Sequence, residues 1–458
     1  MASSSSRFEP RSRLVSHNPN GRHTGYLHPR RRLSALRASE ALPATETAPL
    51  QHVAGFNQKR TALAQAHPPK FLARVLVALI AALAFLGARP DVGASASTVS
   101  SLSALETAIR NAPAGGTVYL AGGTYGSVTL NRHRKTWVTV RPVPGNSVHL
   151  TDLNFGSNAS HIAVRRFQVD GDVDLAPTGA DHIQIFDSDL SGVSAKWGTN
   201  HIRIVHNWIH DCSNCIELVS TASNVPGSPD PNATDLPPVR NIKIVGNRIA
   251  RPSTDAIFMG NYRHIRVQGN EITGVIENGN HNDALQSVYG GDDLVFRGNY
   301  VHDNRGQGFF IKDGRATNVE VSNNLFVRTS GPLWQLQLYR TIGAVIKRNT
   351  AWNSEAPFIL EGADNRRVVV RNNVLNGMYV EDGLQSYYRN RAVLKQYRNI
   401  ITKESGWNWG ATSRDKRVRP DFRAPGRNDF RITKAQARRI GFAAGITWAV
   451  WNRVFGPR

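Results

Sequence analysis

The amino-acid sequence predicts an all-β solenoid, because one short pattern recurs along the chain and each copy carries an asparagine at the same place. Apolar or bulky residues alternate within each copy, which indicates a β-strand. A repeat of this length indicates one supersecondary unit that stacks on its neighbours to bury its apolar face. The eight copies are IRIVHNWI (202–209), IKIVGNRI (242–249), IRVQGNEI (265–272), LVFRGNYV (294–301), VEVSNNLF (319–326), AVIKRNTA (344–351), VVVRNNVL (368–375) and LKQYRNII (394–401).

The asparagine of each copy is expected to point into the interior and to bond the asparagines of the neighbouring coils, about 4.8 Å away. A buried amide without a partner costs roughly 1–3 kcal/mol. An Asn in every coil is therefore stable where a single one would not be. The recurring residues are Asn207, Asn247, Asn270, Asn299, Asn324, Asn349, Asn373 and Asn399.

With this repeat and its interior Asn ladder, the chain resembles the right-handed parallel β-helix of the pectate-lyase-like superfamily over most of residues 97–430. A capped amphipathic helix is expected over Ser97 to Ala112, followed by the strand and turn TVYLAGGTY (117–125). This order is similar to the N-terminal cap of that superfamily. The resemblance implies the fold more strongly than the chemistry, since the same architecture carries lyases, hydrolases, epimerases, esterases and adhesins.

Composition divides the chain into four segments. We expect a disordered basic extension over 1–70, a signal peptide or signal anchor over 71–96, the β-helix over 97–430 and a C-terminal cap or tail over 431–458. The apolar run 75–88 is short for a membrane span, and Ala94-Ser95-Ala96 offers a small-residue cleavage pattern. The expected location is therefore secreted and extracellular, with no stable membrane span after processing. The alternative is a membrane anchor at residues 75–88.

Charge and cysteine content limit the partners. The net charge is +22, but Lys and Arg exceed acids mainly in the two tails, and the solenoid body is nearly balanced. Without a basic stripe interleaved with aromatics, we expect no nucleic acid partner. Cys212 and Cys215 are the two cysteines, and we expect a local disulfide or two packed thiols. A monomer that binds an extended polysaccharide is the expected state.

Two further segments depart from the repeat. The proline-rich run 220–238 is expected to be a loop that decorates one face, where it either borders a binding site or is merely solvated. Residues 420–432 are expected to close the C-terminal end. Trp448, Trp451 and Phe455 follow at helical spacing and are expected to pack over the last coil.

Aligning the coils on their inward residues predicts which side chains stack. The inward positions are Ile216, Ile257, Leu285, Phe309 and Leu333. The residues two positions before them form one column, which holds Asn214, Asp255, Asp283, Gln307 and Gly331. The residues directly after them form an outward column, which holds Glu217, Phe258, Gln286, Phe310 and Trp334. Two residues further lie Gly260, Val288, Lys312 and Leu336. The alignment predicts a patch of Asp255, Asp283, His281, Gln286 and Lys312 on one face.

Each predicted patch residue has a chemical role and a structural alternative. Two stacked carboxylates, Asp255 and Asp283, suit an acid/base dyad, a cation site or a couple salt-bridged to Lys312 or Arg340. Phe310 and Trp334 offer flat surfaces on which sugar rings stack. The alternative is that the two Asp residues cap turns and that the aromatics are covered.

Metal sites are weaker candidates. Residues 170–174 (DGDVD) and the pair Asp187 and Asp189 are expected to be turn residues, with Ca²⁺ binding as the alternative. His206, His210, Cys212 and Cys215 could form a zinc cluster, but His210-Asp211 and His302-Asp303 occupy one recurring turn position, which indicates a structural role. The prediction assigns no metal site, and a Ca²⁺ cofactor stays open.

A uronate polysaccharide is the expected substrate, acted on by a lyase or a C5-epimerase. Elimination needs a positive group on the carboxylate, a base for the C5 proton and an acid for the leaving O4. Lys312 or Arg340 would neutralise the substrate carboxylate. His281 or Lys312 would be the base that takes the C5 proton, and Tyr289 would protonate the leaving O4. The alternatives are a glycoside hydrolase that uses Asp255 and Asp283, and a surface protein that binds glycans without catalysis.

Overall fold

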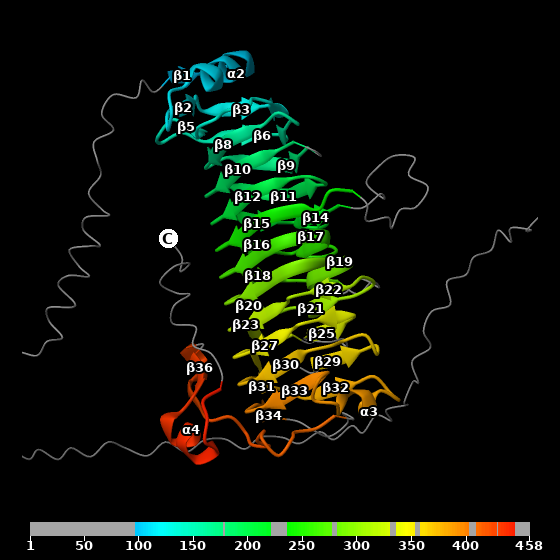
Figure 1. Ribbon diagram of the computed structural model, residues 1–458. Coiled ribbons are helices and arrows are strands. Elements are labelled where there is room, and N and C mark those ends of the chain that lie inside the picture. Colours follow the sequence, from blue (N-terminus) through cyan, green and yellow to red (C-terminus); the bar gives the residue numbers. More distant parts are fainter. Residues whose placement is uncertain are drawn as a thin grey trace, which may run out of the picture. The chain divides into compact units, whose positions relative to one another are not determined.

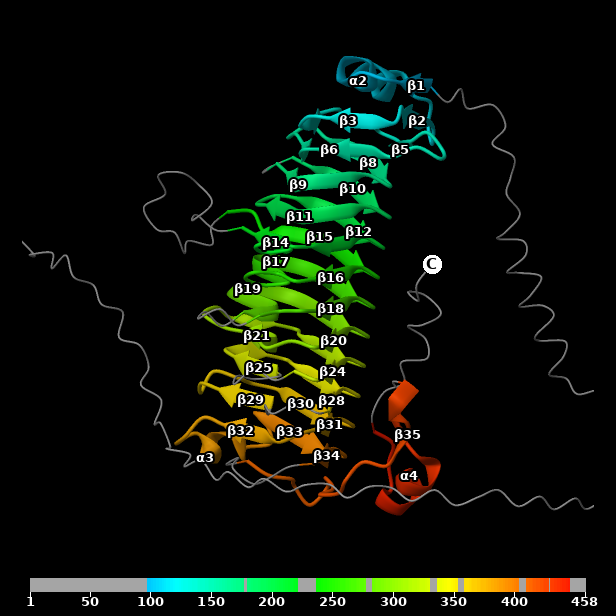
Figure 2. The same ribbon diagram turned by 180° about the vertical axis from the view of Figure 1, so that it is seen from behind.

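The structure is a computed structural model that describes residues 97–176, 179–220, 236–276, 282–329, 336–352, 358–402, 409–427 and 429–444. All described residues belong to one compact unit of the chain. That unit is an all-β parallel solenoid of about 11 turns, as the repeat predicts. Its coils stack in sequence order (Figures 1 and 2). No helix among the described residues is long and apolar enough to cross a membrane.

Each coil contributes strands to three parallel faces, which we name A, B and C in the order in which the chain visits them. Face A contains β2 (Thr117–Leu120), β5 (Val138–Pro142), β8 (Ser160–Arg165), β10 (Asp181–Phe186), β12 (Asn200–Val205), β15 (Val239–Val245), the ends of β17 (Ile257–Gln268) and β19 (Asp283–Arg297), β22 (Ala316–Thr317), β23 (Glu320–Ser322), β26 (Thr341–Ile342), β27 (Val345–Lys347), β30 (Val368–Arg371) and β33 (Leu394–Tyr397).

Faces B and C are built from the shorter strands. Face B contains β3 (Gly123–Tyr125), β6 (Val148–Leu150), the starts of β9 (Gln168–Leu175) and β11 (Asp189–Lys196), β13 (Trp208–His210), β16 (Arg248–Ala250), β18 (Glu271–Thr273), β20 (Tyr300–His302), β24 (Leu325–Val327), β28 (Thr350–Trp352), β31 (Val374–Leu375) and β34 (Ile400–Ile401). Face C contains β4 (Val128–Leu130), β7 (Leu153–Phe155), the ends of β9 and β11, β14 (Ile216–Val219), the starts of β17 and β19, β21 (Gln307–Ile311), β25 (Leu336–Tyr339), β29 (Phe358–Glu361) and β32 (Met378–Val380).

Other elements lie before and after the stack. β1 (Ser97–Val99) pairs with β2, and α2 (Leu102–Asn111) follows, with Leu105 and Ile109 buried in the core. The predicted helix therefore begins later than Ser97, because the first residues add a strand to face A. A short helix, α3 (Gln385–Tyr388), precedes β33. After the last coil, β35 (Phe422–Ala424), the 3-10 turn η2 (Pro425–Arg427), β36 (Asp429–Ile432) and α4 (Lys434–Ile440) form a unit that packs through Phe422 and Phe430 beside β28 and β31. Trp448, Trp451 and Phe455 lie outside the described residues.

The asparagine ladder is present, and its hydrogen bonds all run in one direction. Each ladder Asn up to Asn373 donates from Nδ2 to the Oδ1 of the Asn in the next coil, as Asn247 does to Asn270 at 3.0 Å. The same Oδ1 accepts the backbone N–H of Asn247 at 2.9 Å, and Asn247 Nδ2 also donates to the carbonyl of Ile204. All eight side chains are buried, at 2 % exposure or less. The predicted ladder is confirmed.

Ser188 and Asp415 end the ladder, and the sequence pattern did not reveal them. The first Asn accepts the N–H of Ser188 at 3.0 Å. At the other end, Asp415 Oδ1 accepts both the N–H and the Nδ2 of Asn399, at 2.8 and 2.9 Å. Because every rung donates toward the C-terminal end, the last position needs only an acceptor, and a carboxylate has no donor to leave unpaired.

The residue before each ladder Asn turns the chain from face A to face B with a positive φ. Gly, Asn and His tolerate this conformation better than other residues, which explains the dipeptides Gly-Asn and Asn-Asn in the repeat. The residues concerned are His206, Gly246, Gly269, Gly298, Asn323, Arg348, Asn372 and Arg398.

Two other sequence predictions have clear outcomes. Cys212 and Cys215 form a disulfide. Both ring nitrogens of His210 are hydrogen-bonded, Nδ1 with Asp211 at 2.6 Å and Nε2 with Asp189 at 2.8 Å. His210 therefore belongs to a turn and not to a zinc cluster. Of the loop predicted over 220–238, residues 221–235 lie outside the described residues.

Candidate functional site

Asp255 and Asp283 lie on successive coils, but they face the interior. Asp255 is 3 % exposed and Asp283 is fully buried. Asp255 Oδ1 accepts the backbone N–H of Asp283 at 2.7 Å, and the N–H of Asp255 bonds Asn214 Oδ1 at 3.2 Å. Asn214 and Asp255 therefore cap backbone donors of the next coil between faces B and C. The sequence offered an acid/base dyad, a cation site or a couple salt-bridged to Lys312 or Arg340, with turn capping as the alternative; Asp255 does cap a backbone N–H, and both carboxyl groups are buried.

The outward column of face C follows the predicted register only in part. Glu217 pairs with Phe258, Phe258 with Gln286, and Gln286 with Phe310, as expected. Phe310 then pairs with Gln337, where the alignment had placed Trp334. Leu336 pairs with Phe309 inside the core, where the alignment had placed Leu333, so the expected register differs by three residues at β25. Trp334 itself lies outside the described residues.

Gln286 and Phe310 are buried although they point away from the core cluster. Their exposed fractions are 7 % and 5 %, and Gln337 is 5 % exposed. The ring of Phe310 is therefore not an open platform for a sugar in this structure, which corrects that part of the prediction. The neighbouring inward residues Phe309 and Ile311 do belong to the core cluster.

Lys312 marks the start of a charged cluster on the outer side of face C. Its side chain is 36 % exposed, its Nζ lies 5.8 Å from the centre of the Phe310 ring, and it is 3.7 Å from Asp313 Oδ2. Two residues before it, Phe310 pairs with Gln337, which places Tyr339 beside Lys312 in the next coil. Tyr339 in turn pairs with Glu361.

Glu361 has an unusual carboxyl group for a residue on an outer face. Burial raises its pKa, and the nearby charge of Glu381 raises it further, while the hydrogen bond from Gln337 Nε2 and the charge of Lys312 act in the opposite direction. Glu381 follows in the next coil, where its Oε2 accepts the N–H of Gly362 at 2.7 Å. Lys312, Glu361 and Glu381 therefore place a cation and two interacting carboxyl groups on the outer side of face C, with β25 lying between β21, which Lys312 follows, and β29, which holds Glu361.

The remaining predicted residues lie around this cluster or outside the description. Arg340, 46 % exposed, places its guanidinium 5.1 Å from the centre of the Tyr339 ring and 3.5 Å from Asp364. The side chain of Tyr289 packs against Gly260 in the preceding coil, on the side away from Lys312 in the next coil. His281 lies outside the described residues.

Sequence reasoning missed Gln337, Tyr339, Glu361 and Glu381. The signal was present, because Glu361 ends the strand FILE (358–361) at an outward position. It could not be aligned with Lys312 until the register at β25 was known. Two of the acidic residues considered for Ca²⁺ have cationic partners: Asp187 bonds Arg165 at 3.0 Å, and Asp174 lies 3.9 Å from Lys196.

Comparison with known proteins agrees with this architecture. Residues 232–338 match the family model for the right handed beta helix region. The fold is a right-handed parallel β-helix. No curated protein matches the chain.

Several solved structures are similar at low identity. The PL6 family alginate lyase AlyGC is 13 % identical, with 77 % of this chain and 57 % of that chain covered and a TM-score of 0.46. A rhamnogalacturonan lyase is 11 % identical, with 76 % and 98 % covered and a TM-score of 0.37. A mannuronic acid specific family 6 lyase from human gut microbiota is 13 % identical, with 71 % and 77 % covered and a TM-score of 0.29. The chain thus spans little more than half the length of AlyGC.

Proposed function

We propose that this protein is a secreted lyase or C5-epimerase that acts on an acidic, uronate-containing polysaccharide along the outer side of face C. The observation that carries the proposal is the cluster of Lys312, Glu361 and Glu381. A cation and, two coils further along the same face, a carboxyl group of raised pKa are two of the three groups that elimination requires. Parallel coils repeat about every 4.8 Å, so such a face offers successive contacts to an extended polymer.

The roles follow from the charges. Lys312 would bind the substrate carboxylate and stabilise the negative charge that develops when the C5 proton leaves, with Arg340 as a second cation. Glu361, whose carboxyl group has a raised pKa, would donate a proton to the departing O4. In an epimerase the proton would instead return to the opposite side of C5. His281 as the base and Tyr289 as an acid remain proposals that rest on the sequence. Asp283 and Asp255 are left with a structural role.

A glycoside hydrolase is the second candidate, now on different residues. Two adjacent carboxyl groups, one with a raised pKa, suit an acid and a nucleophile or base. Glu361 and Glu381 satisfy that description on adjacent coils, whereas the buried Asp255 and Asp283 do not.

One assay separates these functions. Purified protein is incubated with alginate, pectate and glucuronan, and the products are followed by ultraviolet absorbance and by reducing-end assay. We expect unsaturated, ultraviolet-absorbing ends for a lyase, and exchange of the C5 hydrogen with solvent without cleavage for an epimerase. New reducing ends without that absorbance would establish hydrolysis instead. Retained binding without any of these products would establish a glycan-binding protein.

A matched pair of variants tests the site. Lys312→Met should lower turnover by about 100-fold or more, the usual effect of removing one group that stabilises developing charge. Lys196→Met is the control, because Lys196 occupies the same outward column several coils away and pairs with Asp174. Both variants should keep the wild-type melting temperature. Full activity in Lys312→Met would refute the placement of the site.

A further inference from the structure

Three histidines form a column on successive coils at the start of face A. His161, His182 and His201 precede the first inward Ile of β8, β10 and β12, and each has a φ between 53° and 56°. Their rings stack with centroids 4.4 and 4.3 Å apart. The turn alone accounts for the column, since His and Asn tolerate a positive φ, and Asn241 occupies the same place in the next coil.

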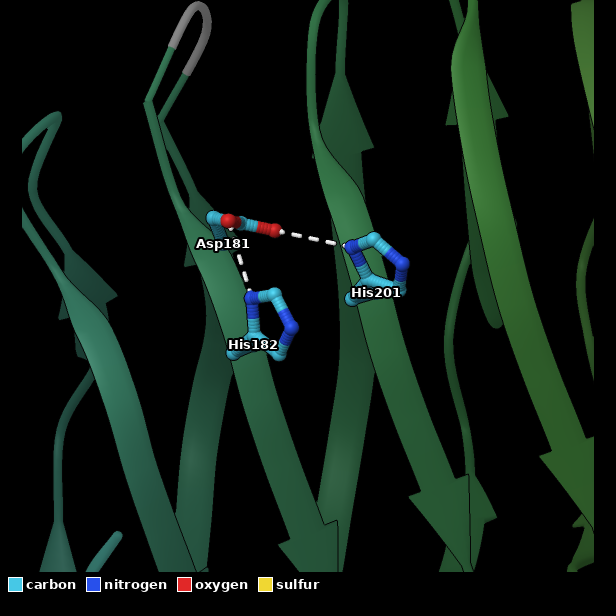
Figure 3. Close-up of side chains that lie close together, drawn as sticks. All are labelled: Asp181, His182 and His201. Atoms are coloured by element: carbon cyan, nitrogen blue, oxygen red, sulfur yellow. Dashed lines mark hydrogen bonds and ion pairs between the residues drawn. The ribbon is translucent and has the colours of Figure 1, made fainter. Parts of the chain in front are cut away.

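The turn conformation does not explain the position of the Asp181 side chain. Its carboxylate faces the Nδ1 edges of two of the rings, with Oδ2 2.9 Å from His182 Nδ1 and Oδ1 3.3 Å from His201 Nδ1 (Figure 3). Despite the short distance to Asp181, the buried Nδ1 of His182 makes no hydrogen bond within the part of the chain that the structure describes. A buried ring nitrogen without a hydrogen bond calls for another partner.

We propose that Asp181, His182 and His201 bind a divalent transition metal ion, with Zn²⁺ as the best match. One carboxylate oxygen and one ring nitrogen of each histidine lie within 4.8 Å of one another. Ligands at 2.0–2.1 Å from a tetrahedral Zn²⁺ are about 3.4 Å apart, so these atoms need to approach one another by at most about 1.4 Å. Imidazole nitrogens with one carboxylate suit Zn²⁺, whereas Ca²⁺ and Mg²⁺ favour oxygen ligands.

The rings must tilt apart to bind the ion, because a metal lies near the plane of each imidazole that holds it. At present the planes of His182 and His201 differ by 22°. Their side chains are 34 % and 47 % exposed, which leaves space for rotation about χ2. Three protein ligands would leave the fourth position to water, as in zinc sites that are open to a substrate.

Other histidines at this turn position have different partners. His161 Nδ1 lies 2.7 Å from Ser160 Oγ. His264 Nδ1 lies 2.8 Å from Asp293 Oδ2, but Arg266 also donates to that oxygen at 2.5 Å, so a cation already occupies the carboxylate. These contacts distinguish the pair around Asp181 from the rest of the column.

The test uses tag-free, full-length protein treated with a chelator and then titrated with Zn²⁺ by calorimetry and with Co²⁺ by visible absorption. We expect one ion per chain and the absorption bands of a tetrahedral Co²⁺ site. Asp181→Asn and His201→Asn should each weaken Zn²⁺ binding at least 10-fold. Asn is chosen because Asn241 shows that it fits this turn.

His264→Asn is the matched control, since it removes a histidine from the same turn position beside a carboxylate. It should leave the Zn²⁺ affinity unchanged, and melting temperatures will show that all three variants are folded. The proposal is overturned if the wild-type protein binds no Zn²⁺ or Co²⁺. Equal affinity in wild-type, Asp181→Asn and His201→Asn proteins would overturn it as well.

Discussion

Replacing Asn299 with Leu, in the middle of the ladder, tests the interaction that holds the coils in register. Asn299 Oδ1 accepts the N–H and the Nδ2 of Asn270, both at 3.0 Å. Its Nδ2 donates to the carbonyl of Val267 at 3.0 Å and to Asn324 Oδ1 at 3.1 Å. Leu has nearly the same size, so the change removes these bonds without opening a large cavity.

The magnitude follows from the groups left behind. Asn324 keeps one donor, the backbone N–H of residue 299. Asn270 loses the acceptor for two buried donors, and each unsatisfied buried donor costs roughly 1–3 kcal/mol. We therefore expect Asn299→Leu to lower the free energy of unfolding by about 2–6 kcal/mol. The carbonyl of Val267 adds to this if it finds no other donor.

Urea unfolding followed by circular dichroism measures the effect, together with the melting temperature from calorimetry. A long solenoid need not unfold in one step, so the first transition of each variant is compared with that of the wild type. Asn154→Leu is the control, because Asn154 lies on the outer side of β7, where it is half-buried and outside the ladder. A loss below about 1 kcal/mol in Asn299→Leu would refute the reasoning that unpartnered amides are costly here.

Three further predictions follow from the same contacts. Asp415→Ala should destabilise by about 2–4 kcal/mol, since it leaves two donors of the last ladder Asn without an acceptor; an unchanged melting temperature would contradict the proposed end of the ladder. Glu361 has a raised pKa, so its ionised form costs stability as the pH rises above the unfolded value; Glu361→Gln should therefore melt higher than wild type at pH 8 and equally at pH 4, and a pH-independent difference would argue against the shift. Gly306→Ala should destabilise, because a Cβ there would lie 2.0 Å from the carbonyl oxygen of Asn282, whereas a Cβ at Gly426 meets nothing within 4 Å and Gly426→Ala should be neutral by thermal melting.

The candidate site shows where sequence reasoning stopped being reliable. The alignment on inward residues placed Glu217, Phe258, Gln286 and Phe310 correctly, because the alternation within each strand fixes which residues face inward. At β25 the alignment was off by three residues, and Gln337 takes the place expected for Trp334, because the number of residues between strands leaves no trace in the strand pattern. The error of three residues also hid Glu361.

Burial was the second point that sequence could not decide. Asp255 and Asp283 stack as the spacing implies, but whether a polar residue at the end of a turn faces water or caps a backbone N–H depends on the path of that turn. The carboxyl groups that remain on the outer face, Glu361 and Glu381, come from coils whose sequence carries no distinguishing motif. Their chemical interest arises from proximity alone.

The sequence by itself determined the all-β solenoid and its asparagine ladder, because alternation and a regular Asn are local signals repeated in every coil. Tertiary structure decided what lies between the repeats: the lengths of the turns, the ends of the ladder at Ser188 and Asp415, and the meeting of Asp181 with two histidines. Those features depend on contacts between coils, which a one-dimensional pattern does not encode.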